Sequence, residues 1–370
     1  MAVEWLLGAA GSWALGKGLD KVASASRSAL SGITSQGTTF LNHDPQFANQ
    51  CYAEVSGKLG EVLPYQEIAD FSDHVRHDVR TRITAQVRPE PFYTQATDFE
   101  WAQARARAYL DYRAQGHAGS DSPVMRVESA AGSEDGFEVV VRPTRYFCQA
   151  ESNLVLDQPV DILTTDKRKV STSLRRLLMS GAHGKLPTLS DIRLANSLGV
   201  VVCFLSKNPK GEISVRMAHR TNHVGVFPSG IHPAMSCAIK WPDKNPAGVQ
   251  VDLMDLIEND VESEIKQETG LEPGQYTKPV PLSFCREFLR AGKPQLFLLS
   301  YTDLPERALN EARDRQMRLN KQTRPEKVEV LGSGILSSRD PSTKVGDRLP
   351  KGLTHEGAAC LFMVERLLRR

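Results

Sequence analysis

Between residues 251 and 271, apolar residues recur at every fourth position. They are Leu253, Ile257, Val261 and Ile265. This period places the four side chains on one stripe of an α-helix, and such a stripe predicts that the helix packs on a sheet. Asp252 suits the N-cap, and Gly270 followed by Leu271 suits a left-handed C-cap. The pattern therefore predicts an amphipathic helix with one buried face.

Other patterns predict strands. Residues 199–205 form a continuous apolar run, which is typical of a central strand that is buried on both faces. Residues 211–219 follow a turn-forming Asn-Pro-Lys-Gly sequence and are predicted to be the hairpin partner of that strand. Further β-rich segments are 124–129, 137–142, 281–288 and 295–301, and further helical segments are 174–179, 304–320 and 354–370. Together they predict a mixed sheet with inserted helices.

The composition changes near residue 122, and this change divides the chain into two predicted parts. Residues 24–48 are rich in Ser, Gly and Thr and predict a linker. Helical patterns are found at 45–59, 65–85 and 98–113. We therefore predict a small helical N-terminal module at 1–121 and one α/β domain at 122–370.

The charge balance and the cysteines exclude several classes of protein. The chain has 370 residues, with 46 Lys and Arg against 44 Asp and Glu, so its formal net charge of +2 gives no strong nucleic-acid signal. The six cysteines are scattered and form no Cys-x-x-Cys pair, which favours a reducing compartment over a disulfide framework. We expect a cytoplasmic protein.

The N-terminal segment is uncharged from Trp5 to Gly16. Because a membrane-spanning helix needs about twenty apolar residues, we expect no transmembrane segment, and Glu4 replaces the basic flank of a signal peptide. Two interpretations of residues 4–23 stay open. The segment is either a helix that packs on its own domain or a helix that contacts a protein partner or a membrane surface.

A second, acidic period runs along the predicted helix at 251–271. Asp260, Glu264 and Glu268 stand at positions i, i+4 and i+8, and Gln267 is three residues after Glu264. Clustered carboxylate oxygens suit Mg²⁺ or Mn²⁺ that bridges to substrate phosphates. The alternative is a solvated acidic face, supported by pairs such as Glu262 with Lys266.

This segment resembles the signature of the Nudix hydrolase family, G-x5-E-x7-R-E-U-x-E-E-x-G-U, in which U is a bulky aliphatic residue. The last nine positions of the signature align with residues 263–271, and five of them match. The matching residues are Glu264, Ile265, Glu268, Gly270 and Leu271. The sequence departs from the pattern at Ser263, which replaces the Arg, and at Gln267, which replaces one of the paired glutamates. The box is therefore degenerate.

The resemblance extends over about residues 137–370 and implies a Nudix-like α/β/α sandwich. In that family the box glutamates hold a divalent metal that assists cleavage of a pyrophosphate linked to a nucleoside or another group. The resemblance thus implies Glu264, Glu268 and Gln267 as catalytic residues, with Mg²⁺ or Mn²⁺ held by Glu264, Glu268 and Asp260. Candidates for contact with a nucleotide-type substrate are Arg216, His219 and Arg286, from the segments that flank the box.

Three hypotheses stay open at this point. The first is a metal-dependent hydrolase that cleaves a nucleoside-diphosphate-linked compound. The second is a catalytically weakened Nudix-like module that binds a nucleotide-type ligand for regulation, and the substitutions at Ser263 and Gln267 favour it. The third is a scaffold in which the acidic side chains only face solvent.

Overall fold

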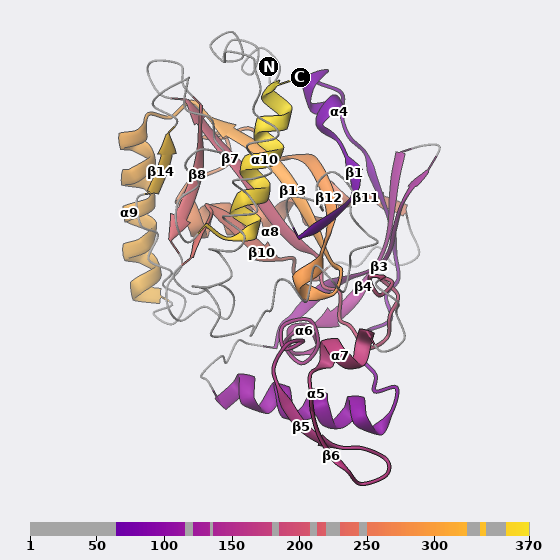
Figure 1. The fold of residues 1–370 in the computed structure, drawn as a ribbon. Coiled ribbons are helices and arrows are strands. Elements are labelled where there is room, and N and C mark those ends of the chain that lie inside the picture. Colours follow the sequence, from indigo (N-terminus) through magenta and orange to yellow (C-terminus); the bar gives the residue numbers. More distant parts are fainter. Residues whose placement is uncertain are drawn as a thin grey trace.

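In the computed structural model of the protein, the described residues are 64–114, 121–133, 136–179, 185–207, 213–219, 230–243, 250–323, 334–337 and 353–369. They form a mixed α/β fold with mixed sheets (Figure 1). Among them, no helix combines the length and the apolar character needed to cross a membrane. The predictions for residues 4–23, 24–48 and 45–59 lie outside the described residues.

The largest sheet has eight strands, in the order β1-β12-β13-β7-β8-β14, with β10 paired to β7 and β9 paired to β8. The strands are β1 (Tyr65–Asp70), β7 (Gly199–Lys207), β8 (Ile213–His219), β9 (Ile231–Pro233), β10 (Met235–Ala238), β12 (Val280–Glu287), β13 (Lys293–Thr302) and β14 (Gly334–Ser337). β13 runs parallel to β7, and the other pairs are antiparallel. The prediction of a mixed sheet is confirmed.

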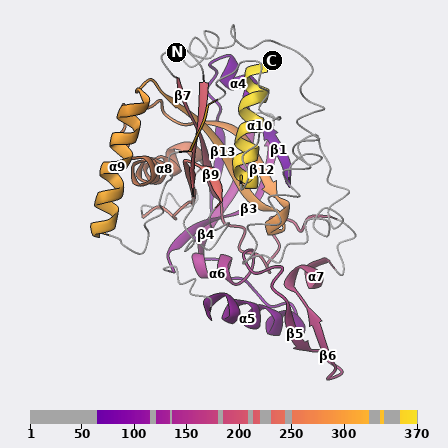
Figure 2. The ribbon, with the colours of Figure 1, turned by 60° about the vertical axis from the view of Figure 1, so that its left-hand side comes forward.

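The central strand β7 separates two hydrophobic cores. Val200, Val202 and Phe204 face the core that contains α8 (Leu253–Thr269), whereas Val201 and Cys203 face the core that contains α10. α9 (Glu306–Thr323) packs beside α8, and α10 (His355–Arg369) covers the opposite face of the sheet (Figure 2). The apolar run at 199–205 is thus buried on both sides, as predicted.

A second sheet lies on the α8 side and has the order β11-β2-β4-β3. Its strands are β2 (Ile83–Val87), β3 (Pro123–Ser133), β4 (Gly136–Arg145) and β11 (Gln250–Asp252). β3 and β4, which contain the β-rich segments 124–129 and 137–142, form an antiparallel hairpin, and β2 runs parallel to β4. β11 leads directly into α8, so this sheet fixes the start of the box helix.

A third unit has its own core at the far end of the molecule (Figure 1). It comprises α5 (Phe99–Ala114), α6 (Tyr146–Ala150), β5 (Val160–Leu163), β6 (Lys169–Thr172) and α7 (Leu174–Met179). Buried Trp101 and Leu174 belong to this core. Arg175 joins the unit to the central sheet, because it pairs with Asp157 and also donates to the carbonyl oxygens of Phe288 and Leu289.

The prediction of one helix at 65–85 is wrong. The segment contains β1, the short helix α4 (Ser72–Arg76) and β2. β1 pairs with β12 at the edge of the largest sheet, and β2 pairs with β4 and β11. Residues 65–87 therefore complete sheets whose other strands all come after residue 122.

Candidate functional site

The box helix α8 forms as its sequence predicts. The Asp252 side chain caps the first turn by accepting a hydrogen bond of 3.0 Å from the backbone N–H of Met254. Gly270 ends the helix at φ 74°, in the left-handed region that favours glycine. The apolar stripe is buried against the sheets, at Leu253, Ile257, Val261 and Ile265. The acidic positions consequently lie along a second, more exposed face.

A lysine occupies the middle of the acidic face. The Nζ of Lys240 lies 2.9 Å from Asp260 Oδ1 and 2.9 Å from Glu264 Oε1. The backbone N–H of Lys240 also donates to Asp260 Oδ2 at 2.8 Å. Burial alone would lower the pKa of Lys240, but the bonds to the two carboxylates raise it above its usual value. The ammonium therefore stays charged at neutral pH and offsets both acids.

This arrangement does not fit Mg²⁺ or Mn²⁺ at the predicted ligands. Asp260 and Glu264 already share a cation, and the ligand atoms of Asp260, Glu264 and Glu268 do not converge as one group of donors among the described residues. Gln267 Nε2 donates to Ser263 Oγ at 2.9 Å, so the two residues that depart from the signature bond to each other. Burial, and then the charge of Glu264, raises the pKa of the Cys237 thiol.

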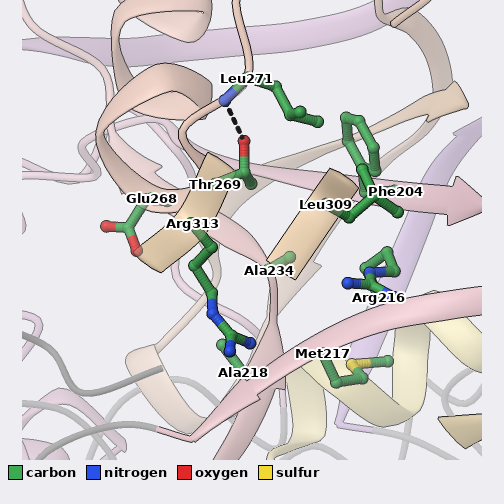
Figure 3. A pocket seen from close by; sticks show the side chains of 10 residues that line it. All are labelled: Phe204, Arg216, Met217, Ala218, Ala234, Glu268, Thr269, Leu271, Leu309 and Arg313. Carbon is green, nitrogen blue, oxygen red and sulfur yellow. Dashed lines mark hydrogen bonds between the residues drawn. The ribbon is translucent and has the colours of Figure 1, made fainter. Parts of the chain in front are cut away.

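A pocket opens beside the C-terminal end of α8, between β8 and α9 (Figure 3). Its lining residues are Phe204, Arg216, Met217, Ala218, Ala234, Glu268, Thr269, Leu271, Leu309 and Arg313. The arginines come from β8 and α9, and Glu268 comes from the last turn of α8. The pocket thus joins two of the predicted site residues, Arg216 and Glu268, with Arg313, which the sequence did not single out.

The pocket holds two arginines and one carboxylate, Glu268, and Arg313 also lies 3.5 Å from Asp314. Burial, and to a smaller extent the charge of Arg313, lowers the pKa of Arg216, whereas Glu306 opposes the shift. The Nε of Arg313 is buried and has no hydrogen-bond partner among the described residues. Two guanidinium groups in a partly desolvated place favour an anion, since Arg presents several donors in a geometry that matches phosphate.

Arg286, another predicted substrate contact, lies at the turn between β12 and β13. Arg286 Nε donates to the carbonyl oxygen of Gly292 at 3.2 Å, and its guanidinium also donates to the carbonyl oxygen of Pro187. It therefore holds the turn between β12 and β13 and does not line the pocket. His219 is the last residue of β8, and its side chain lies outside the described part of the chain.

A buried polar cluster, which sequence analysis missed, lies on the opposite face of the sheet at the start of α10. His355 Nε2 lies 2.9 Å from Glu287 Oε1, and Arg290 lies 3.3 Å from Glu287 and 3.4 Å from Glu356. Lys293 is also buried, and burial followed by the charge of Arg290 lowers its pKa to about 8. Glu287, His355 and Glu356 form a buried group that could hold a metal ion.

One sequence signal could have pointed to this cluster. Glu287 ends β12 and Lys293 begins β13, and both strands are rich in apolar residues. Charged side chains at such positions are rarely buried without partners. The partners, His355 and Glu356, come some seventy residues later in the chain, so no local pattern connects them.

Comparisons with known proteins give only a distant likeness. No family model and no curated protein sequence matches the chain. A crystal structure of a Nudix hydrolase from M. smegmatis, RenU, covers 45% of this chain and 97% of its own at 10% identity, with a TM-score of 0.21. A crystal structure of a Deinococcus radiodurans protein covers 40% of this chain and 72% of its own at 10% identity, with a TM-score of 0.20. Similarity this low carries no information about activity or ligand.

Proposed function

We propose that this protein binds a phosphorylated small molecule of nucleotide type in the pocket between β8, α8 and α9, and that α8 does not hold a catalytic metal. The observation that carries the proposal is that Arg216 and Arg313 line the same pocket. This is the binding hypothesis favoured by the degenerate box.

The lining of the pocket suits the two parts of such a ligand. Arg216 and Arg313 provide donors for phosphate oxygens, which arginine binds through charge-assisted hydrogen bonds. Phe204, Leu271 and Leu309 provide an apolar floor for an organic group. The Glu268 carboxylate can accept hydrogen bonds from sugar hydroxyls but repels phosphate. We therefore expect the phosphate group to contact Arg216 and Arg313 and the hydroxyl groups to contact Glu268. Figure 3 labels these three side chains.

The contacts of Lys240 with Asp260 and Glu264 favour ligand binding over metal-dependent cleavage. Metal-assisted attack on a pyrophosphate needs carboxylates that are free to hold the cation and to lower the pKa of a bound water. Asp260 and Glu264 both contact the Lys240 ammonium at 2.9 Å. A divalent ion would have to displace this lysine and to leave its charge without a partner.

The proposal predicts a specific loss of binding in an arginine variant. In calorimetric titrations with ADP, Arg313→Ala is expected to weaken binding by about 10- to 100-fold, because a hydrogen bond to a charged group contributes about 1.5–3 kcal/mol. Arg307→Ala is the matched control, since Arg307 lies on the same helix, is 90% exposed and pairs with Glu311. If both variants bind ADP equally well, the pocket is not the binding site.

A metal-dependent hydrolase is the second candidate. The observation that favours it is the position of Glu268, which lines the pocket one helical turn after Glu264. In this case Mg²⁺ must displace Lys240, so cleavage would require Mg²⁺ and would be lost in Glu264→Gln.

A further inference from the structure

The buried cluster below α10 offers a metal-binding donor set that is separate from the acidic face of α8. One ligand atom each from Glu287, His355 and Glu356 lies within 4.8 Å of the others, and all three residues are buried. Glu287 ends β12, whereas His355 and Glu356 form the first turn of α10. The Thr354 hydroxyl fixes this turn by accepting from the backbone N–H of Gly357 at 3.1 Å.

A second observation comes from Tyr65 at the start of β1. Its side chain is fully buried, and its hydroxyl has no hydrogen-bond partner among the described residues. The ring lies 5.5 Å from the His355 ring between centroids. Burial raises the pKa of this hydroxyl, and the charges of Glu287 and Glu356 raise it further, which places the hydroxyl in their neighbourhood. A buried polar atom without a hydrogen-bond partner among the described residues thus belongs to a residue that packs against one of the three ligands.

His355 Nε2 lies 2.9 Å from Glu287 Oε1, but the contacts from Arg290 to the two carboxylates are longer. Arg290 approaches Glu287 at 3.3 Å and Glu356 at 3.4 Å, whereas charge-assisted hydrogen bonds between nitrogen and oxygen usually measure about 2.7–2.9 Å. His232 Nε2 lies 3.1 Å from Glu356 Oε2. Both Glu287 carboxylate oxygens are buried without a hydrogen-bond partner among the described residues, and because such a group is costly, the cluster can gain from a closer cation.

We propose that Glu287, His355 and Glu356 hold a divalent transition-metal ion of the Zn²⁺ class. One imidazole nitrogen with two carboxylate oxygens is a donor set that suits Zn²⁺, whereas Mg²⁺ prefers oxygen ligands and keeps several waters. Three protein ligands would leave one tetrahedral position, and we expect the nearby Tyr65 hydroxyl to hydrogen-bond to the ligand there. The ion clamps the first turn of α10 to the end of β12.

Metal analysis tests this proposal on the full chain. After chelation and reloading with ZnCl₂, the wild-type protein is expected to retain about one Zn²⁺ per chain, and Co²⁺ should give the visible absorption bands of a tetrahedral site. Glu356→Gln and His355→Ala are expected to lose both signals. Glu365→Gln is the matched control, because Glu365 is 4% exposed on the same helix and is not one of the three ligands. It should keep both.

A milder variant guards against simple misfolding. Tyr65→Phe keeps the buried ring and removes only the hydroxyl, so the fold should persist while the affinity for Zn²⁺ falls by about 10- to 100-fold. Circular dichroism establishes that each variant is folded before its metal content is compared. A wild-type protein that takes up no Zn²⁺ overturns the proposal, and so does a folded Glu356→Gln variant that binds Zn²⁺ as tightly as the wild type.

Discussion

Gly270→Ala is expected to lower the free energy of unfolding by about 2–4 kcal/mol, through a left-handed φ of 74° and a clash with α9. An added Cβ would lie 2.6 Å from the carbonyl carbon of Ala312 and closer still to its oxygen. These atoms are backbone and cannot rotate away. The helices α8 and α9 would have to separate at the point where they form the pocket.

Gly274→Ala is the control for the energetic cost of placing alanine at a left-handed φ. Gly274 has a similar φ of 88°, but an added Cβ would meet nothing within 4 Å. Its cost is therefore expected to be only about 1 kcal/mol. Urea unfolding of both variants measures the difference, which reports the α8–α9 contact. If the two losses are equal, close packing between α8 and α9 does not shape the pocket.

Asp157→Ala is expected to destabilise the protein by about 3 kcal/mol, because it leaves the buried Arg175 without its carboxylate. The pair is bidentate, at 2.5 and 2.7 Å, and the Arg175 side chain is 0% exposed. Arg175 also donates to the carbonyl oxygens of Phe288 and Leu289. Without Asp157, Arg175 is held less firmly. The variant should therefore disturb the turn that carries Arg290 and weaken the contact between the third unit and the central sheet.

The exposed pair Asp166 with Arg168 is the comparison for this variant. Its ion-pair distance is also 2.5 Å, but its side chains are 56% and 79% exposed. Because solvent screens such pairs, Asp166→Ala should leave the unfolding midpoint unchanged. Chemical unfolding followed by tryptophan fluorescence compares the two. A loss in Asp166→Ala as large as that in Asp157→Ala would show that burial does not decide the effect.

Local patterns predicted the elements whose periodicity is strong. The stripe from Leu253 to Ile265, with Asp252 and Gly270 as caps, gave α8 nearly to the residue. The continuous apolar run at 199–205 gave the central strand β7. In both cases the hydrophobic period, the turn chemistry and the length agree within one segment, so no distant partner is needed to recognise it.

Segments that depend on distant partners were predicted wrongly or missed. β1 is an edge strand in which polar and apolar residues are mixed, and it is stabilised by pairing with β12 more than two hundred residues later. Its sequence carries no alternation that would separate a strand from a helix.

The candidate site likewise depends on residues that are distant in the sequence, so local patterns predicted only part of it. The sequence placed Arg216 and Glu268 among the candidates, and both line the pocket. Arg313 stands on a highly charged helix where many arginines are exposed, so no pattern distinguishes it. Lys240 stands twenty positions before Asp260, with β11 between them. Its contact with the acidic face follows from tertiary packing alone.

Phosphorus NMR of a nucleoside diphosphate sugar, with excess Mg²⁺, tests the central claim most directly. The claim is that the protein binds such a compound through Arg216 and Arg313 without cleaving it. The expected result is a phosphorus resonance that broadens or shifts with wild-type protein, stays unchanged with Arg313→Ala, and shows no product over time. Product resonances that grow with wild-type protein and Mg²⁺, and that vanish in Glu264→Gln, would contradict the claim and establish a metal-dependent hydrolase.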